Sequence, residues 1–250
     1  MQNSIPEEHT RTVALVSEKG LDRLKNARVA VFGIGGVGGH LAEALARAGV
    51  GHLVLVDRDR VSLSNINRQA VALHSTVGRS KVEVMKERIE DINPDCRVDI
   101  HELFYLAETA DQFDLSLYDY VADCVDTVAA KIELVVRCNQ VGTPIIAAMG
   151  AGNKLFPEKF RISDISKTET DPLARVLRRE LKKRNVKKLL CVWSDEQPYD
   201  SALLGENGKP APASISFVPA TMGLIMAGEI IRAIAFGEDY ATNRGVLYER

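Results

Sequence analysis

Short apolar runs alternate with amphipathic stretches over the first 150 residues of the chain. Such alternation is typical of a parallel β-sheet whose strands are joined by crossover helices. Strands are predicted at Arg28–Gly33, His52–Asp57, Arg97–Leu103, Tyr120–Val125 and Pro144–Met149. The spacing of apolar residues predicts helices at Gly36–Ala48, Arg79–Ile92, Val128–Val141 and Thr221–Ala235. We therefore expect an α/β fold with a Rossmann-like, mainly parallel sheet and helices on its faces.

The pattern changes after residue 149. A strand, a basic helix and a second strand are predicted, at Phe160–Ile165, Pro172–Arg184 and Lys188–Trp193. A polar segment that contains Pro and Gly follows, Ser194–Ser214, and a connection of this length inside a compact domain is usually functional or mobile. We expect residues 1–150 to form the main domain and residues 151–250 a smaller C-terminal, substrate-binding extension. Its final helix should return to the main domain, and residues 194–214 should be mobile.

Composition and charge narrow the class of protein without identifying a partner. The chain is 46% hydrophobic and 26% charged, with a formal net charge of -2, which is typical of a globular protein and gives no overall argument for nucleic acid or a membrane. Glu229 and Arg232 interrupt the longest apolar run, which favours a buried helix over a membrane span. The polar start, MQNSIPEEHT, does not resemble a signal peptide, so a cytoplasmic location is expected. The cysteines form no CxxC pair, which argues against structural zinc: Cys96, Cys124, Cys138 and Cys191.

A glycine-rich turn lies between the first predicted strand and the first predicted helix, in RVAVFGIGGVGGHLAEALARAGVGHLVLVD. Gly33, Gly35 and Gly38 match the spacing GxGxxG, in which missing Cβ atoms let backbone N–H groups approach phosphate oxygens at a helix N-terminus. Asp57 ends the next strand, where an acidic residue that binds a ribose hydroxyl is expected. These features predict a nucleotide site. NAD-dependent oxidoreductases share them, so the identity of the nucleotide stays open at this point.

Charged side chains near other strand ends favour a triphosphate over a dinucleotide, because a triphosphate requires more positive charge and a metal ion. Arg68 follows Asp57 closely, in the polar stretch VSLSNINRQ. Lys81 opens the next helix, and Asp126 follows the fourth strand. In an open parallel sheet the ligand crevice lies at the carboxyl ends of the strands, so we expect these three charged side chains to converge there.

Four motifs, GIGGVG, DRDRVSLSNINRQ, GRSK and CVDT, resemble in order and spacing the ThiF/MoeB/HesA family of ubiquitin-activating-enzyme-like adenylating proteins. The resemblance covers Arg11 to about Gly152 and implies that residues 1–150 are an ATP-binding adenylation domain. It implies that Asp57 binds the ribose, with Asp59 close by, and that Asp126 holds Mg²⁺ or steers the α-phosphate. The rest of the implied ATP site consists of Gly33, Gly35, Gly36, Gly38, Asn65, Arg68, Gln69 and Lys81.

The second half of the chain narrows the activity. Family members that activate ubiquitin-like sulfur-carrier proteins commonly hold a zinc ion in two CxxC pairs, which this chain lacks. The stretches ERIEDINPDCRV, ISDISKTETDPLARVLRREL, LLCVWSDEQP and FVPATMGLIMA instead resemble the tRNA threonylcarbamoyladenosine dehydratases of the family. That resemblance implies ATP-dependent cyclisation of threonylcarbamoyladenosine in tRNA, through adenylation of its carboxylate. Activation of a sulfur carrier is the alternative, and whether a sulfur-transfer protein is a further partner is open.

Two residues outside these motifs are further candidates. Arg11 matches the N-terminal arginine that family members donate to the ATP of a partner subunit, so the resemblance implies a homodimer. A surface arginine without a role is the alternative. Cys191 ends a predicted strand beside the long polar segment, where related enzymes place an acyl-accepting cysteine. Its apolar surroundings, LLCVW, favour inert packing instead.

The basic helix gives an independent argument for a nucleic-acid substrate. Arg175, Arg178, Arg179 and Lys182 are spaced i, i+3, i+4 and i+7, so they share one helix face. One sign of charge concentrated in a chain that is otherwise near neutral is typical of a contact with a phosphate backbone. We expect this face to bind tRNA, with an ordinary solvated helix face as the alternative.

Overall fold

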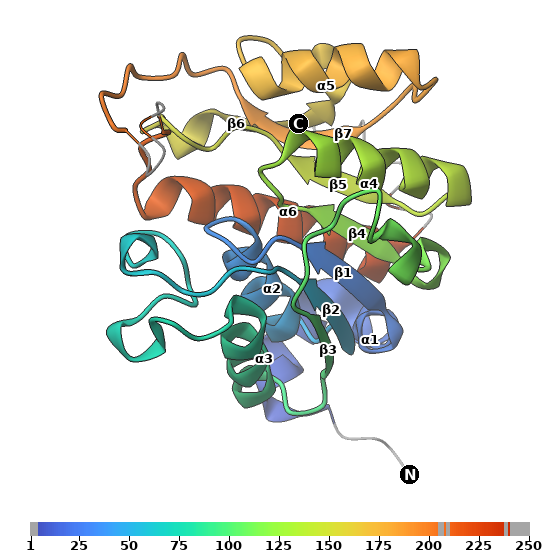
Figure 1. Ribbon diagram of the computed structural model, residues 1–250. Helices are drawn as coiled ribbons and strands as arrows, with labels where there is room; N and C mark the ends of the chain where they lie inside the picture. Colours follow the sequence, from blue (N-terminus) through green and yellow to red (C-terminus); the bar gives the residue numbers. More distant parts are fainter. Residues whose placement is uncertain (1–4, 205–207, 209–210, 238–239, 241–250) are drawn as a thin grey trace.

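The computed structural model describes residues 5–204, 208, 211–237 and 240, and its centre is a seven-stranded sheet (Figure 1). The strands are β1 Arg28–Phe32, β2 His52–Val56, β3 Arg97–His101, β4 Tyr120–Asp123, β5 Ile145–Ala148, β6 Phe160–Asp164 and β7 Leu190–Ser194. Their order is β3-β2-β1-β4-β5-β7-β6, and every neighbouring pair is parallel except β6 with β7. The expected α/β fold with a Rossmann-like, mainly parallel sheet is confirmed.

Helices cover both faces of this sheet: α1 Thr10–Asn26, α2 Gly38–Arg47, α3 Lys81–Ile92, α4 Val128–Val141, α5 Pro172–Lys183 and α6 Phe217–Phe236. Successive side chains of β1 point to opposite faces and are apolar on both. Val29 and Val31 pack in one buried cluster with residues of α2, α3 and α6. Ala30 and Phe32 pack in a second cluster with residues of α4. A sheet buried on both faces explains why its strands are continuous apolar runs in the sequence.

The sheet continues past residue 150. β5 pairs in parallel with β7, with Ala147 opposite Cys191. Helix α6 packs against α1 and α2, and its contact with α2 is close, because a Cβ atom on Gly223 would lie 2.3 Å from the carbonyl oxygen of Val37. The glycine loop before α2 therefore rests on a helix from the far end of the chain.

Helices α1 and α6 differ most from the sequence-based expectation. Helix α1 is not predicted by the apolar pattern, because its buried residues are only Gly20, Leu21 and Leu24. Ser17, with φ of 68°, also interrupts its helical backbone and breaks the periodicity. Helix α6 begins at Phe217, before the predicted start, because a proline in the first turn of a helix needs no N–H donor.

Helix α6 is long and apolar enough to cross a membrane by length and composition alone. This is a weak indication, because core helices share these properties, and 44% of its most apolar window is buried inside the fold. No other helix among the described residues meets the same criteria.

Candidate active site

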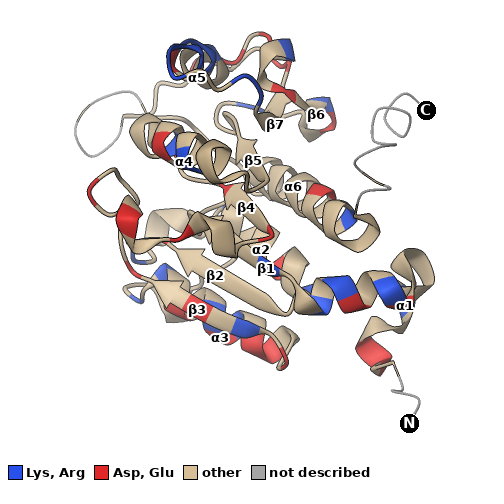
Figure 2. Ribbon diagram, turned by 90° about the vertical axis from the view of Figure 1, so that its right-hand side faces the viewer, with Lys and Arg blue, Asp and Glu red and all other residues tan. Residues whose placement is uncertain are grey.

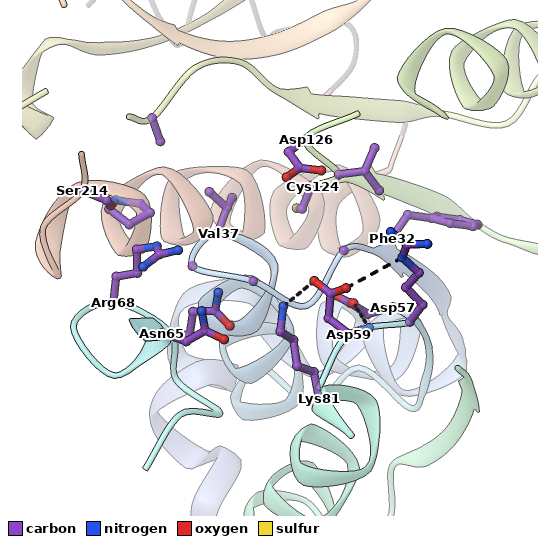
Figure 3. A pocket seen from close by; sticks show the side chains of 18 of the residues that line it. Phe32, Val37, Asp57, Asp59, Asn65, Arg68, Lys81, Cys124, Asp126 and Ser214 are labelled. Atoms are coloured by element: carbon purple, nitrogen blue, oxygen red, sulfur yellow. Dashed lines mark hydrogen bonds and ion pairs between the residues drawn. The ribbon is translucent and has the colours of Figure 1, made fainter. Parts of the chain in front are cut away.

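A pocket of about 360 Å³ opens beside the carboxyl ends of β1 and β4 (Figure 3). The strand order reverses between these two strands, and ligands of open α/β sheets bind at such a point. Ala151, Gly152 and Pro212–Ser214 line one part of the pocket. The predicted ATP-site residues that line it are Gly33, Gly35, Gly36, Asp57, Asp59, Asn65, Arg68, Gln69, Lys81 and Asp126.

The glycine loop between β1 and α2 forms one wall of the pocket. Gly33 has φ of 90°, and a Cβ atom there would lie 2.7 Å from the carbonyl oxygen of Cys124, so glycine is required. A Cβ atom on Gly35 would meet only Nε2 of Gln69, at 3.8 Å. Gly38 differs from the prediction, because it does not line the pocket. A Cβ atom on Gly38 would lie 1.8 Å from the carbonyl oxygen of Gly33, so its role is close packing of the helix.

Asp57 and Lys81 connect three segments at the base of the pocket. The Asp57 carboxylate accepts hydrogen bonds from the N–H groups of Ile34, at 2.7 Å, and of Asp59, at 2.8 Å. Burial raises the pKa of the Asp57 carboxyl, and nearby Lys81 opposes that rise. Lys81 is only 5% exposed, and its Nζ lies 2.9 Å from Oδ2 of Asp59. The glycine loop, the end of β2 and the start of α3 are thereby held together, as the dashed lines in Figure 3 show.

Asn65 and Gln69 lie in the polar stretch between β2 and α3. Oδ1 of Asn65 accepts from the N–H of Ser62 at 3.1 Å, so this oxygen stabilises the short 3-10 turn Leu63–Asn65. Oε1 of Gln69 is buried and has no hydrogen-bond partner among the described residues. A buried polar atom without a protein partner is unusual and is consistent with a ligand contact.

Arg68 is the cation of this stretch. Its Nη1 donates to the carbonyl oxygen of Ser64, at 3.0 Å, and to Oδ1 of Asn67, at 2.8 Å. Its Nη2 and Nε have no partner in the part of the chain that the structure describes. Guanidinium N–H donors of this kind suit phosphate oxygens. Figure 3 shows Arg68 beside the pocket, on the same side as Ser214.

Asp126 lies across the pocket from Lys81 in Figure 3 and is exposed. Its Oδ1 accepts from the hydroxyl of Thr127 at 3.3 Å. Mg²⁺ is usually bound by one or two protein carboxylates together with substrate phosphates, so this exposed carboxylate fits such an ion. The described residues contain no group of three or more His, Cys, Asp or Glu side chains that could hold a metal ion.

A buried ion pair, which the sequence reasoning missed, lies next to the loop of Asp126. Asp123 and Lys131 are 0% and 1% exposed, and Nζ lies 3.1 Å from Oδ1. Lys131 also donates to the carbonyl oxygen of Ala148 at 2.8 Å, and the N–H of Val125 donates to Oδ1 of Asp123 at 3.3 Å. Burial raises the pKa of the Asp123 carboxyl, and Lys131 opposes that rise. The pair joins the ends of β4 and β5. The sequence feature that could have indicated it is a lysine inside the otherwise apolar stretch VAAKI.

The long polar segment supplies a wall of the pocket that the sequence did not predict. The N–H of Asn153 donates to the carbonyl oxygen of Ala213 at 2.8 Å, and Oδ1 of Asn153 accepts from the N–H of Ala213 at 2.6 Å. A Cβ atom on Gly152 would lie 2.6 Å from Cβ of Pro212, so these two residues pack closely. Residues 205–207 and 209–210 of this segment lie outside the described residues.

Two predicted catalytic residues do not line the pocket. Cys191 is 0% exposed, its Sγ donates to the carbonyl oxygen of Ser163 at 3.5 Å, and burial raises the pKa of its thiol to about 12. A buried, protonated thiol is inert, which agrees with the packing role that the apolar surroundings favoured and not with an acyl-accepting cysteine; Cys191 packs between the sheet and α5. Arg11 is exposed on α1, outside the pocket of its own chain, and its donation across a homodimer stays a prediction.

The basic face of α5 is only partly as expected. Figure 2 shows that the ribbon of α5 is rich in Lys and Arg positions, and Arg175, Arg179 and Lys182 are exposed. Arg178 is half-buried, and its Nη1 donates to the carbonyl oxygen of Thr168 at 2.6 Å. Arg178 thereby stabilises the turn before the helix, and its assignment to the tRNA-binding face stays a prediction.

Comparisons with known proteins place this geometry in a family. The profile of the ThiF family matches residues 8–249. The tRNA threonylcarbamoyladenosine dehydratase of Bacillus subtilis is 46% identical over 235 residues, which cover 89% of this chain and 92% of that protein. The Escherichia coli protein of the same name is 42% identical over 193 residues, 74% of this chain and 72% of that protein.

Solved structures agree with the sequence comparisons. Escherichia coli tRNA N6-threonylcarbamoyladenosine dehydratase, TcdA, has been solved in complex with AMP and in complex with ATP. Both structures match with a TM-score of 0.82 and 36% identity, over 90% of this chain and 92% of theirs. The resemblance inferred from the motifs is confirmed, and the chain belongs to the ThiF family.

Proposed function

We propose that this chain catalyses the ATP-dependent cyclisation of threonylcarbamoyladenosine in tRNA, with net loss of water. One observation carries the proposal: a pocket that gathers Arg68, Lys81 and Asp126 occurs in a chain that matches 92% of a tRNA threonylcarbamoyladenosine dehydratase at 46% identity. The related structures with ATP and AMP support ATP as the second substrate.

The reaction balances as two displacements. A carboxylate oxygen of the threonylcarbamoyl group attacks the α-phosphorus of ATP, and the bond from that phosphorus to the bridging oxygen of pyrophosphate breaks. The carbamoyl oxygen then attacks the activated carbonyl carbon, AMP leaves with the former carboxylate oxygen, and an N–H proton passes to solvent. The products are the cyclic nucleoside, AMP and pyrophosphate.

The chain's residues would position the substrates and neutralise charge. The N–H groups of the glycine loop would hold phosphate oxygens, and Asp57 would hold the ribose. The unpartnered donors of Arg68 and the ammonium of Lys81 would neutralise the charge that grows on departing pyrophosphate, which is the main work of such a step. Lys81 would then divide its charge between the phosphate and Asp59.

We include Mg²⁺ because the carboxylate of Asp126 fits it: it is exposed, it faces the pocket, and it belongs to the ligand class that Mg²⁺ prefers. When bound, the ion would neutralise phosphate charge and help to orient the triphosphate. Asp126 is the one protein ligand that we assign to it.

Three exposed basic residues of α5 would bind the phosphate backbone of the tRNA: Arg175, Arg179 and Lys182. A tRNA substrate agrees with the expected cytoplasmic location. The proposed reaction needs no membrane as a partner. A sulfur-transfer protein as a further partner stays a prediction from the family resemblance.

A homodimer is part of the proposal. Large apolar side chains are exposed on the adjacent helices α1 and α6, such as Leu15, 83% exposed, and Leu224, 54% exposed. Removing such surface from water against a second copy is favourable. A second copy bound to this face would bring its own nucleotide pocket within reach of the exposed Arg11.

The function is tested by incubation with tRNA that carries threonylcarbamoyladenosine, ATP and Mg²⁺, followed by mass spectrometry of the nucleosides. We expect the modified nucleoside to lose one water while AMP and pyrophosphate form in equal amounts. Release of AMP only with a carrier protein that ends in Gly-Gly would support the alternative, a sulfur-carrier-activating enzyme. Binding of NADH without ATP would contradict adenylation, and binding of intact ATP without turnover would indicate a non-catalytic module.

A further inference from the structure

Asn67 connects the phosphate-side arginine to the opposite wall of the pocket. Its Oδ1 accepts a hydrogen bond from Nη1 of Arg68 at 2.8 Å, and its Nδ2 donates to the carbonyl oxygen of Ser214 at 2.9 Å. Arg68 and Ser214 both line the pocket, and Figure 3 shows them close to each other. Asn67 itself does not line the pocket, so it acts on a ligand only through these two neighbours.

The two hydrogen bonds use both ends of the Asn67 amide. A guanidinium only donates and a backbone carbonyl only accepts, so the group between them must accept at one end and donate at the other. The side-chain amide of asparagine does both within one planar group. A rotation of that plane changes both hydrogen bonds together. The position of Arg68 and the position of Ser214 are therefore mechanically linked through Asn67.

Ser214 belongs to a wall of the pocket that is separate from the glycine loop. Pro212–Ser214 and Ala151–Gly152 form this wall. Asn153 holds this wall at its other end, by two hydrogen bonds to Ala213 and by accepting one from the N–H of Tyr199 at 2.8 Å. Among the described residues the wall thus has fixed points at Asn153 and at Asn67, and Asn67 is the one bonded to Arg68.

We propose that Asn67 is a positioning residue that couples ATP binding to tRNA binding, an inference that rests on the proposed function. Phosphate oxygens that bind the unpartnered nitrogens of Arg68 fix its guanidinium. The fixed guanidinium orients the amide of Asn67, and the amide holds Ser214 where the nucleoside of the tRNA needs it. Coupling between two binding sites is reciprocal, so bound tRNA tightens ATP binding by the same factor.

The test compares the dissociation constant of α,β-methylene-ATP, which cannot release pyrophosphate, with and without tRNA that carries threonylcarbamoyladenosine. In the wild type the tRNA should lower this constant by about fivefold or more, the range usual for coupled sites. Asn67→Ala, which removes both hydrogen bonds, should bring the ratio close to one. Asn67→Asp should do the same, because it keeps an acceptor for Arg68 but has no donor for Ser214. Asn139→Ala, at an exposed position of α4, is the matched control and should keep the wild-type ratio.

The possible results distinguish coupling between the two binding sites from an effect of Asn67 on folding, and from an error in the proposed function. Asn67 is exposed, so its variants should unfold at the wild-type temperature, and a merely structural role would not change the ratio. A wild type that converts the tRNA but has a ratio of one overturns the coupling and leaves the proposed function standing. So does an Asn67→Ala variant with the wild-type ratio. A wild type that neither binds nor converts the tRNA overturns both.

Discussion

Gly33 and Gly38 of the same loop lack a side chain for different physical reasons. Gly33 has a positive φ and lies against the backbone of Cys124 at the pocket, whereas Gly38 makes room for the first turn of α2 against the loop. Asp57 likewise combines two functions, because its carboxylate caps two backbone N–H groups and also faces the pocket. At the scale of single residues, the shape of the pocket therefore depends on backbone conformation as well as on charged side chains.

Arg68 and Lys81, two of the cationic residues that line the pocket, give a prediction at this scale. Arg68→Ala and Lys81→Ala should each lower kcat by about 100- to 1,000-fold, because each removes positive charge that stabilises the departing pyrophosphate. The measurement is the rate of pyrophosphate release with saturating ATP and tRNA. Cys191→Ala, as a control within the core, should keep the wild-type rate, because the buried thiol is not a nucleophile. Undiminished rates in both cation variants would remove the assignment of the phosphate site.

The ends of neighbouring strands are the elements that hold the pocket together. The Asp123–Lys131 pair joins β4 to β5, and the Lys81–Asp59 pair joins the end of β2 to the start of α3. The two pairs differ in burial, because Asp59 is 57% exposed whereas both members of the first pair are almost fully buried. Loss of one partner therefore has very different consequences at the two places.

Lys131→Met should lower the free energy of unfolding by about 3–5 kcal/mol, because it leaves the carboxylate of Asp123 buried without its partner. The double variant Asp123→Val with Lys131→Met should regain most of that loss, since a buried ion pair can be replaced by apolar groups at little cost. Urea unfolding of the three proteins measures both effects. A double variant as unstable as Lys131→Met would contradict this account of the pair.

The exposed face of α5 gives a second prediction at the scale of elements. Changing Arg175, Arg179 and Lys182 to Glu should weaken tRNA binding and reduce the slope of log affinity against log salt by about one for each lost phosphate contact. Filter binding over a series of salt concentrations measures the slope. Arg47→Glu, at an exposed position of α2, is the control and should leave the slope unchanged. Unchanged tRNA affinity in the triple variant would contradict the proposal that this face of α5 binds tRNA.

The elements differ in how far the sequence predicts them. Strands buried on both faces are continuous apolar runs, so β1, β2 and β4 are visible in the sequence, and a polar cluster directly after a strand predicts residues of the pocket. Helix α1 is not visible, because few of its residues are buried. The Pro212–Ser214 wall could not be predicted either, since it is held through the backbone groups of Ala213 and Ser214, and backbone groups have no sequence signature. Helical spacing places Arg178 on the basic face but does not reveal the loop packed against it, to which Arg178 donates a hydrogen bond.

At the scale of the whole molecule, the proposed exchange of Arg11 between subunits gives a prediction. Arg11→Ala and Lys81→Ala chains should each be inactive alone, and their mixture should regain activity. A mixed dimer has one pocket in which the intact Lys81 of one chain meets the intact Arg11 of the other. Turnover assays on the refolded mixture measure this, with the wild type treated in the same way as reference. A mixture that stays inactive would contradict the exchange.

Helix α6 lies directly behind the glycine loop, with Gly223 against Val37 and Pro219 against Gly36. The ribosome makes the loop early and this helix late, and chains begin to fold from the N-terminus during synthesis. The first strands and helices can therefore form before anything supports the loop from behind. The nucleotide pocket is complete only after α6 has been made, so an incomplete chain cannot hold ATP as the finished protein would.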